Sequence, residues 1–126
     1  MAVIRNEEAE WFEMEPGIDV KVLSHETVGA TALHSGMATF GPGAGLACHT
    51  HDCEESVTIL AGEAYLDVDG RRTLLTPLDT SVVQADVPHR YSNASSESPM
   101  KMFWVYASAD AARTIVDAEL CAIGGE

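Results

Sequence analysis

Residues 43–62 read GAGLACHTHDCEESVTILAG and hold two of the chain's five histidines within three positions. His49 and His51 are two residues apart, and in a β-strand such residues project from the same face. The two imidazoles are then roughly 7 Å apart along the strand, close enough to converge on one divalent ion. Glu55 follows at an even spacing, after a break at Asp52-Cys53, and opens the next predicted strand.

The fourth candidate ligand is His89, which lies 34 residues beyond Glu55. That interval accommodates two hairpins, which would bring a later strand back beside the first pair. Three imidazoles and one carboxylate form a mixed N/O set, which suits Fe(II), Mn(II), Co(II), Ni(II) or Zn(II) better than Ca(II) or Mg(II). We therefore predict one divalent transition metal, with coordination positions left open for water, substrate or dioxygen. Its predicted ligands are His49, His51, Glu55 and His89.

Outside this segment, Gly and Pro punctuate the chain at short intervals with β-branched residues between them, which is typical of many short strands. The predicted strands cover residues 18–23, 31–40, 47–51, 55–60, 63–68, 71–75, 80–84, 89–93 and 100–106. Ser108 is placed to cap a helix over residues 109–120, although the β-branched run Thr114-Ile115-Val116 weakens that prediction. Short antiparallel strands with at most one helix predict an all-β sandwich or barrel.

Two segments resemble the motifs of the cupin family. The first motif is matched at every defined position, by Gly43, His49, His51, Glu55 and Gly62. The segment 89–93, preceded by Pro88, is similar to the end of the second motif, with its His and its Asn four residues later. The family pattern has Gly, Pro and Gly where this chain has Leu78, Gln84 and Asp86. The resemblance covers residues 30–107 of a chain that we interpret as one domain, residues 1–126.

The resemblance implies an antiparallel jelly-roll barrel, also described as a double-stranded β-helix, which is often dimeric. It implies the same four metal ligands, with Asn93 as a supporting residue. It does not imply one reaction, because cupins include dioxygenases, isomerases, epimerases, decarboxylases, lyases and non-enzymatic binders.

Other interpretations of the same residues stay open. A zinc site that combined both histidines with Cys48 and Cys53 would need a tight loop, and Cys48 is opposite in phase to the histidines. Glu54 could replace Glu55 as a ligand, but its phase argues against it. The three cysteines, which include Cys121, make an odd count. Free thiols are therefore favoured over a Cys48–Cys53 disulfide in a chain without a signal peptide.

His34 and Tyr106 are the candidates for proton transfer. For His34, a surface or hydrogen-bonded strand position is the more common alternative. The sequence also predicts that no cation is aimed into the barrel, because Arg90 points away from His89 and the other arginines considered, Arg71 and Arg72, flank a hairpin turn.

The leading hypothesis is a metal-dependent enzyme acting on an organic metabolite that chelates the metal through oxygen. An Fe(II) ion would favour a dioxygenase, whereas Mn(II), Ni(II) or Zn(II) would favour isomerisation, elimination or decarboxylation by Lewis-acid chemistry. The alternatives are a metal-containing module that binds or senses a small ligand without turnover, and an inert barrel whose site is filled by metal acquired during purification.

The net charge argues against two classes of binding partner. Twenty Asp and Glu against seven Lys and Arg give a net charge of −13, which repels nucleic acids and anionic membranes. No apolar run approaches the roughly 20 residues of a membrane span, and the acidic first fifteen residues do not resemble a signal peptide. We therefore expect a cytoplasmic protein that binds a small-molecule substrate, and family habit suggests a homodimer.

Overall fold

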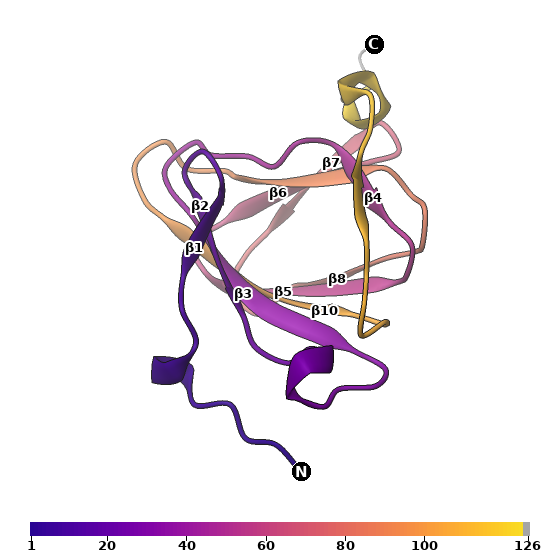
Figure 1. Ribbon diagram of the computed structural model, residues 1–126. Helices are drawn as coiled ribbons and strands as arrows, with labels where there is room; N and C mark the ends of the chain where they lie inside the picture. Colours follow the sequence, from indigo (N-terminus) through magenta and orange to yellow (C-terminus); the bar gives the residue numbers. More distant parts are fainter. Residues whose placement is uncertain (125–126) are drawn as a thin grey trace.

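Two antiparallel sheets face each other in the computed structural model, which describes residues 1–124 (Figure 1). The first sheet, sheet A, has the order β1 (Phe12–Glu15), β2 (Ile18–Val22), β3 (His34–Phe40), β10 (Met100–Tyr106), β5 (Glu55–Ala61) and β8 (Thr80–Val83). The second, sheet B, has the order β11 (Arg113–Ile115), β4 (His49–His51), β9 (His89–Asn93), β6 (Ala64–Val68) and β7 (Arg71–Leu75). The predicted all-β barrel is confirmed.

The core lies between the sheets because the strands alternate buried and less buried side chains. In β10 this alternation places Met100, Met102 and Trp104 inside, and β10 sits at the centre of sheet A between β3 and β5. Sheet B contributes Leu66 and the fully buried Tyr91, whose hydroxyl lies 2.9 Å from the Ser81 hydroxyl of the facing sheet. The chain thus encloses an apolar interior, with the start of β4, β5 and β9 at one end of it.

Three of the residues with left-handed backbone occupy positions where the family pattern has glycine, and only one of these three is a glycine. Gly62 has φ +75°, and a Cβ atom there would lie 2.5 Å from the Pro99 carbonyl oxygen, so this motif position requires glycine. Leu78 (φ 75°) and Asp86 (φ 64°) keep the left-handed conformation at positions where the family pattern has glycine. The loops therefore retain their geometry without glycine, at a cost in backbone strain.

The C-terminal segment differs from its prediction. Residues 109–120 do not form one helix: β11 pairs with β4 as an edge strand, and only the short 3-10 helix η3 (Ala118–Cys121) follows. The β-branched Thr114 and Ile115 favour an extended backbone, and pairing with β4 provides hydrogen-bond partners for its N–H and C=O groups. Two other 3-10 helices, η1 (Asn6–Glu8) and η2 (Glu26–Val28), lie near the N-terminus. The described residues contain no helix long and apolar enough to span a membrane.

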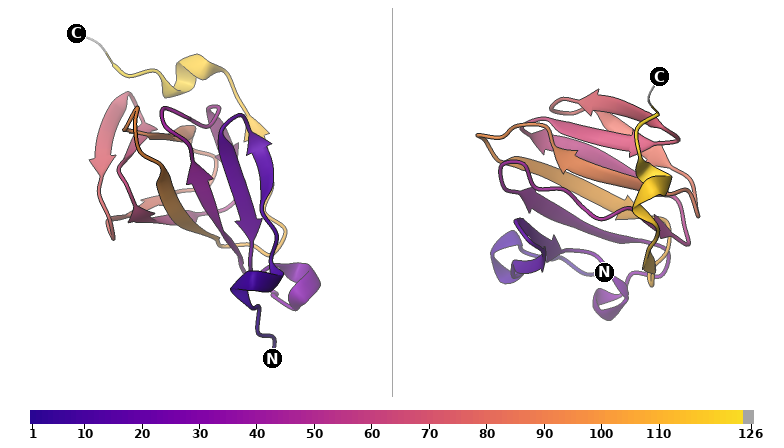
Figure 2. Two further views of the ribbon diagram at one scale, coloured as in Figure 1. Left: turned by 90° about the vertical axis from the view of Figure 1, so that its left-hand side faces the viewer. Right: turned by 90° about the horizontal axis from the view of Figure 1, so that it is seen from above.

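The cysteines also differ from the prediction of free thiols. Cys48 and Cys121 form a disulfide, and Cys53 is the free thiol. Cys48 immediately precedes β4, and Cys121 ends η3, so the bridge fastens the end of the chain beside the predicted metal ligands. An ion pair between Glu15 and Arg113 joins the edge strands β1 and β11. The two sheets that these strands border can be followed in Figure 2.

Candidate metal centre

Four side chains from three strands meet at one end of the barrel. His49 and His51 come from β4, Glu55 opens β5, and His89 opens β9, where it is the register partner of His49. Each of the four is at most 3% exposed, and one ligand atom from each lies within 4.8 Å of the others. The structure therefore brings together all four residues that the sequence singled out. Glu54, the alternative to Glu55, instead accepts a hydrogen bond from Gln84 at the surface.

Backbone carbonyl groups orient the three imidazoles. In each ring the Nδ1 atom is within hydrogen-bonding distance of a carbonyl oxygen, at 2.7 Å for His49 and Ala47, 2.8 Å for His89 and Val87, and 3.3 Å for His51 and Ala112. An Nδ1–H that donates to a carbonyl leaves the lone pair on Nε2. This is the tautomer that a metal-ligating histidine needs.

The Nε2 atoms fit a bound cation. Nε2 of His89 and of His51 lie 3.0 and 3.6 Å from the same carboxylate oxygen of Glu55. Nε2 of His51 is fully buried, and it has no hydrogen-bond partner among residues 1–124. A buried nitrogen lone pair without a partner is costly, and a divalent ion would satisfy it together with the carboxylate. The donor set therefore fits one divalent transition metal.

Burial favours the neutral, metal-binding form of His49 and His51. It lowers the pKa of His49 to about 3, and the backbone hydrogen bond to Ala47 opposes that shift only in part. Burial likewise lowers the pKa of His51, against the attraction of the Glu55 carboxylate. Protons therefore compete weakly with a metal for His49 at neutral pH.

A narrow cavity of about 50 Å³ opens beside these ligands. His49 and Glu55 form part of its wall, and the apolar part includes Phe40, Met102 and Trp104. The indole Nε1 of Trp104 is buried without a hydrogen-bond partner in the described part of the chain. The wall of the cavity is thus apolar apart from a few polar side chains, which include two of the candidate ligands.

The two candidates for proton transfer lie differently with respect to this cavity. Tyr106 is part of its wall, and its ring centroid is 4.4 Å from that of His51. Burial and the Glu55 carboxylate raise the pKa of Tyr106, so its phenol is protonated at neutral pH. His34 is the register partner of Tyr106 and meets its ring edge to face at 5.5 Å, but it is not part of the cavity wall.

A cation does reach the cavity, contrary to the expectation from the sequence. Arg113 of β11 is the register partner of His51 and forms part of the cavity wall. Arg113 was not predicted as a site residue, because a helix was expected over residues 109–120. The β-branched residues that follow Arg113 were the available signal for a strand, in which it could face the same way as a metal ligand.

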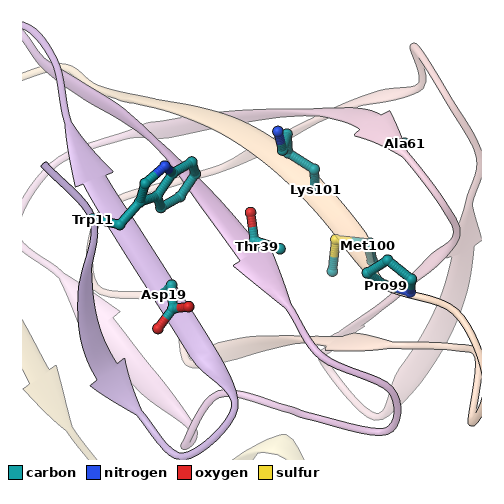
Figure 3. A pocket seen from close by; sticks show the side chains of 7 residues that line it. All are labelled: Trp11, Asp19, Thr39, Ala61, Pro99, Met100 and Lys101. Atoms are coloured by element: carbon teal, nitrogen blue, oxygen red, sulfur yellow. The ribbon is translucent and has the colours of Figure 1, made fainter. Parts of the chain in front are cut away.

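A larger hollow of about 520 Å³ lies on the outer face of sheet A (Figure 3). Trp11, Thr39 and Lys101 border it, and the Lys101 ammonium is 5.7 Å from the centre of the Trp11 ring. None of the four candidate metal ligands borders this hollow. The barrel interior, and not this surface, therefore holds the chemistry described above.

Comparison with known proteins agrees with this architecture. Residues 36–106 match the family described as "Cupin domain". A relative, "Polyketide synthase CurC" of Streptomyces cyaneus, is 32% identical over 97 residues, which cover 72% of this chain and 63% of that protein. The chain thus spans less than two thirds of the length of that relative.

Two solved structures share the fold at low sequence identity. The polyketide cyclase RemF of Streptomyces resistomycificus has a TM-score of 0.75 and 16% identity, covering 95% of this chain and 89% of that one. Oxalate decarboxylase of Bacillus subtilis, described with Mn(II) centres, has a TM-score of 0.75 and 23% identity, covering 87% of this chain and 30% of that one. The family match, the two-sheet barrel and the buried His-rich cluster agree, and the chain belongs to the cupin family.

Proposed function

We propose that the protein is a metal-dependent enzyme that activates carbonyl groups of a poly-β-ketone or a related oxygen-chelating metabolite. The observation that carries the proposal is the buried cluster of three histidines and Glu55 at the wall of an apolar cavity. When bound, a divalent ion would polarise carbonyl oxygens that chelate it and acidify the carbon between them. A 1,3-diketone has its two oxygens in the positions that such chelation needs.

The relatives favour carbonyl chemistry over oxygenation. The relative of 32% identity is called a polyketide synthase, and RemF is a polyketide cyclase with the same fold. In a cyclisation, a methylene carbon loses a proton and bonds to a carbonyl carbon, whose oxygen gains a proton and becomes a hydroxyl group. The former methylene carbon then loses its second proton, a C=C bond forms, and the hydroxyl group takes up a proton and leaves as water. The reaction consumes no oxidant, so Mn(II), Ni(II) or Zn(II) would serve it.

Tyr106 is the proposed proton donor to the carbonyl oxygen. Its phenol stays protonated, and its ring lies against His51 in the cavity wall. His34 contacts Tyr106 edge to face from outside the cavity wall, and we propose that it positions the Tyr106 ring. Replacement Tyr106→Phe should therefore lower kcat more than it raises KM, whereas His34→Ala should have the smaller effect on kcat.

The test starts with the metal content of anaerobically purified protein, measured by elemental mass spectrometry. The protein loaded with its metal is then incubated with synthetic linear poly-β-ketones under nitrogen and under air, with product masses and oxygen uptake recorded. The proposal is supported if dehydrated products form at the same rate under nitrogen and under air. Oxygen uptake with oxygen-containing products would instead identify a dioxygenase. Failure to take up any divalent metal would overturn the metal centre itself.

A further inference from the structure

The cavity beside the candidate metal ligands contains one cation, Arg113, and its surroundings are built to hold it there. An ion pair of 2.7 Å joins Nη1 of Arg113 to Oε2 of Glu15, across 98 positions of sequence. The other carboxylate oxygen of Glu15 accepts a hydrogen bond of 3.0 Å from the amide of Ala47. Glu15 is therefore fixed at both oxygens, so it positions Arg113 and does not swing freely.

Ala47, which holds Glu15 through its amide, also contacts the predicted metal ligand His49. The carbonyl group of Ala47 is the hydrogen-bond partner of Nδ1 of His49, at 2.7 Å, while its amide holds Glu15. Arg113 is the register partner of His51 across β11 and β4. Residue 47 and the strand pairing thus set the guanidinium in a defined position relative to two of the predicted ligands.

Most of the hydrogen-bonding capacity of Arg113 is unused. A guanidinium has five N–H donors, and within residues 1–124 the guanidinium of Arg113 donates a hydrogen bond only to Glu15. Its side chain is 26% exposed and forms part of the cavity wall.

The charges of the cavity favour an anion once a metal is bound. Glu15 and Glu55 contribute two negative charges and Arg113 one positive charge, so a divalent ion would leave an excess of one positive charge in a chain whose net charge is −13. We propose that Arg113 binds a carboxylate of the substrate, separate from the oxygens that chelate the metal. This inference rests on the proposed function, because it adds to the chelating substrate the requirement for one anionic group.

The carboxylate is the favoured group for geometric reasons. A guanidinium offers parallel N–H bonds that match the two oxygens of a carboxylate, and such charge-assisted bonds are about twice as strong as neutral ones. The apolar wall of Phe40, Met102 and Trp104 gives a neutral chain no comparable partner. Arg113 would therefore determine which end of a chelating substrate enters the narrow cavity.

The test compares two probes of equal shape in Zn(II)-loaded protein, which avoids oxidation of the probes. 3,4-Dihydroxybenzoate carries a chelating diol and a carboxylate, and 3,4-dihydroxybenzamide replaces the carboxylate by a neutral amide. Calorimetric titration of wild-type protein should give a Kd at least tenfold lower for the benzoate. In Arg113→Gln the preference for the benzoate should disappear, while the Kd for the benzamide stays within twofold of its wild-type value. Arg113→Lys should retain part of the preference for the benzoate.

Arg71→Gln is the matched control, because it removes the same charge from an exposed position on β7 outside the cavity. Zinc titration of each variant separates loss of the metal from loss of the anion site. A wild-type protein that binds both probes equally, or a preference that survives in Arg113→Gln, overturns the role of Arg113 and leaves the proposed function standing. If Zn(II)-loaded wild-type protein binds neither probe, the chelating site is overturned, and the role of Arg113 with it.

Discussion

The indole ring of Trp104 occupies the space that a side chain at Gly36 would need. A Cβ atom at Gly36 would lie 2.6 Å from Cζ2 of Trp104 and 2.5 Å from the carbonyl oxygen of Lys21. Gly36 and Trp104 are register partners in β3 and β10, so the absence of a side chain at Gly36 leaves room for the indole ring. The wall of the cavity thus depends on a residue that does not itself form part of it.

Replacement Gly36→Ala is expected to lower the free energy of unfolding by about 2 kcal/mol, because the overpacked indole must move. Urea unfolding measures the loss, and tryptophan emission should shift as Trp104 is displaced. Gly41→Ala is the control, since the nearest atom to a Cβ there is 3.5 Å away. Equal losses in the two variants would show that Trp104 does not depend on Gly36.

Replacement His51→Ala is expected to weaken binding of Zn(II) more than about 100-fold, because loss of a second-shell partner alone costs roughly 10–100-fold. Competition with a chromophoric chelator measures the affinity. His34→Ala should leave it unchanged, since His34 is outside the four-residue cluster. Unchanged zinc affinity in His51→Ala would remove this residue from the ligand set.

The metal-free protein should lose stability on acidification. The pKa of His49 is lowered to about 3 in the folded state by burial, against an ordinary value of 6.5. The unfolded chain therefore binds more protons below pH 6.5, and the loss continues until the pH reaches the folded value. Between pH 7.5 and pH 5 this group alone costs about 2 kcal/mol.

Urea unfolding of chelator-treated protein across that pH range measures the dependence. His49→Gln should flatten it, because the amide does not titrate. A stability that rises as the pH falls from 7.5 to 5 would contradict the buried neutral imidazole.

Replacement Leu78→Gly is expected to stabilise the protein by up to about 1 kcal/mol. Leu78 is 75% exposed and has φ 75°, so its side chain contributes little packing while the backbone is strained. Leu78→Ala removes the same side chain but keeps the strain, and it should be nearly neutral. Thermal unfolding compares the three proteins, and destabilisation by the glycine would indicate that the leucine packs usefully.

The disulfide should contribute about 2–4 kcal/mol to stability, because it closes a loop of 73 residues. Urea unfolding of Cys121→Ser should show this loss, whereas Cys53→Ser should not, because Cys53 is a free thiol. The C-terminal segment would still be held by backbone hydrogen bonds from Val116 to Cys48 and from Gly124 to Gly70. Equal stability of the two variants would show that the bridge does not constrain the chain.

The four candidate ligands were predictable because their signal is local. The spacing of His49 and His51 fixes a shared face, and Glu55 and His89 follow at motif positions. The core strands were predictable for a related reason, since alternation and turn residues recur over short ranges, as in β10. The homodimer expected from family habit stays a prediction.

The edge strands were not predictable from local pattern. β1 is an acidic segment with mostly exposed side chains, and it becomes a strand because Phe12 and Glu13 pair with β2. Arg113 reaches the cavity only because β11 pairs with β4, a contact between residues about sixty positions apart. Pairing over such distances leaves no periodic signature in either segment.

Glu15 and Arg113 lie on β1 and β11, outside residues 36–106 that match the cupin family. The barrel and the four ligands can therefore be inherited unchanged while the two edge strands diverge. If Arg113 binds a substrate carboxylate, as we propose, then exchanging only these short margins between relatives would change the charge preference of the site. The separation is incomplete, because the carbonyl group of Ala112, next to β11, also orients the imidazole of His51. A change in β11 that keeps this backbone contact would alter the proposed anion site and leave the orientation of His51 in place.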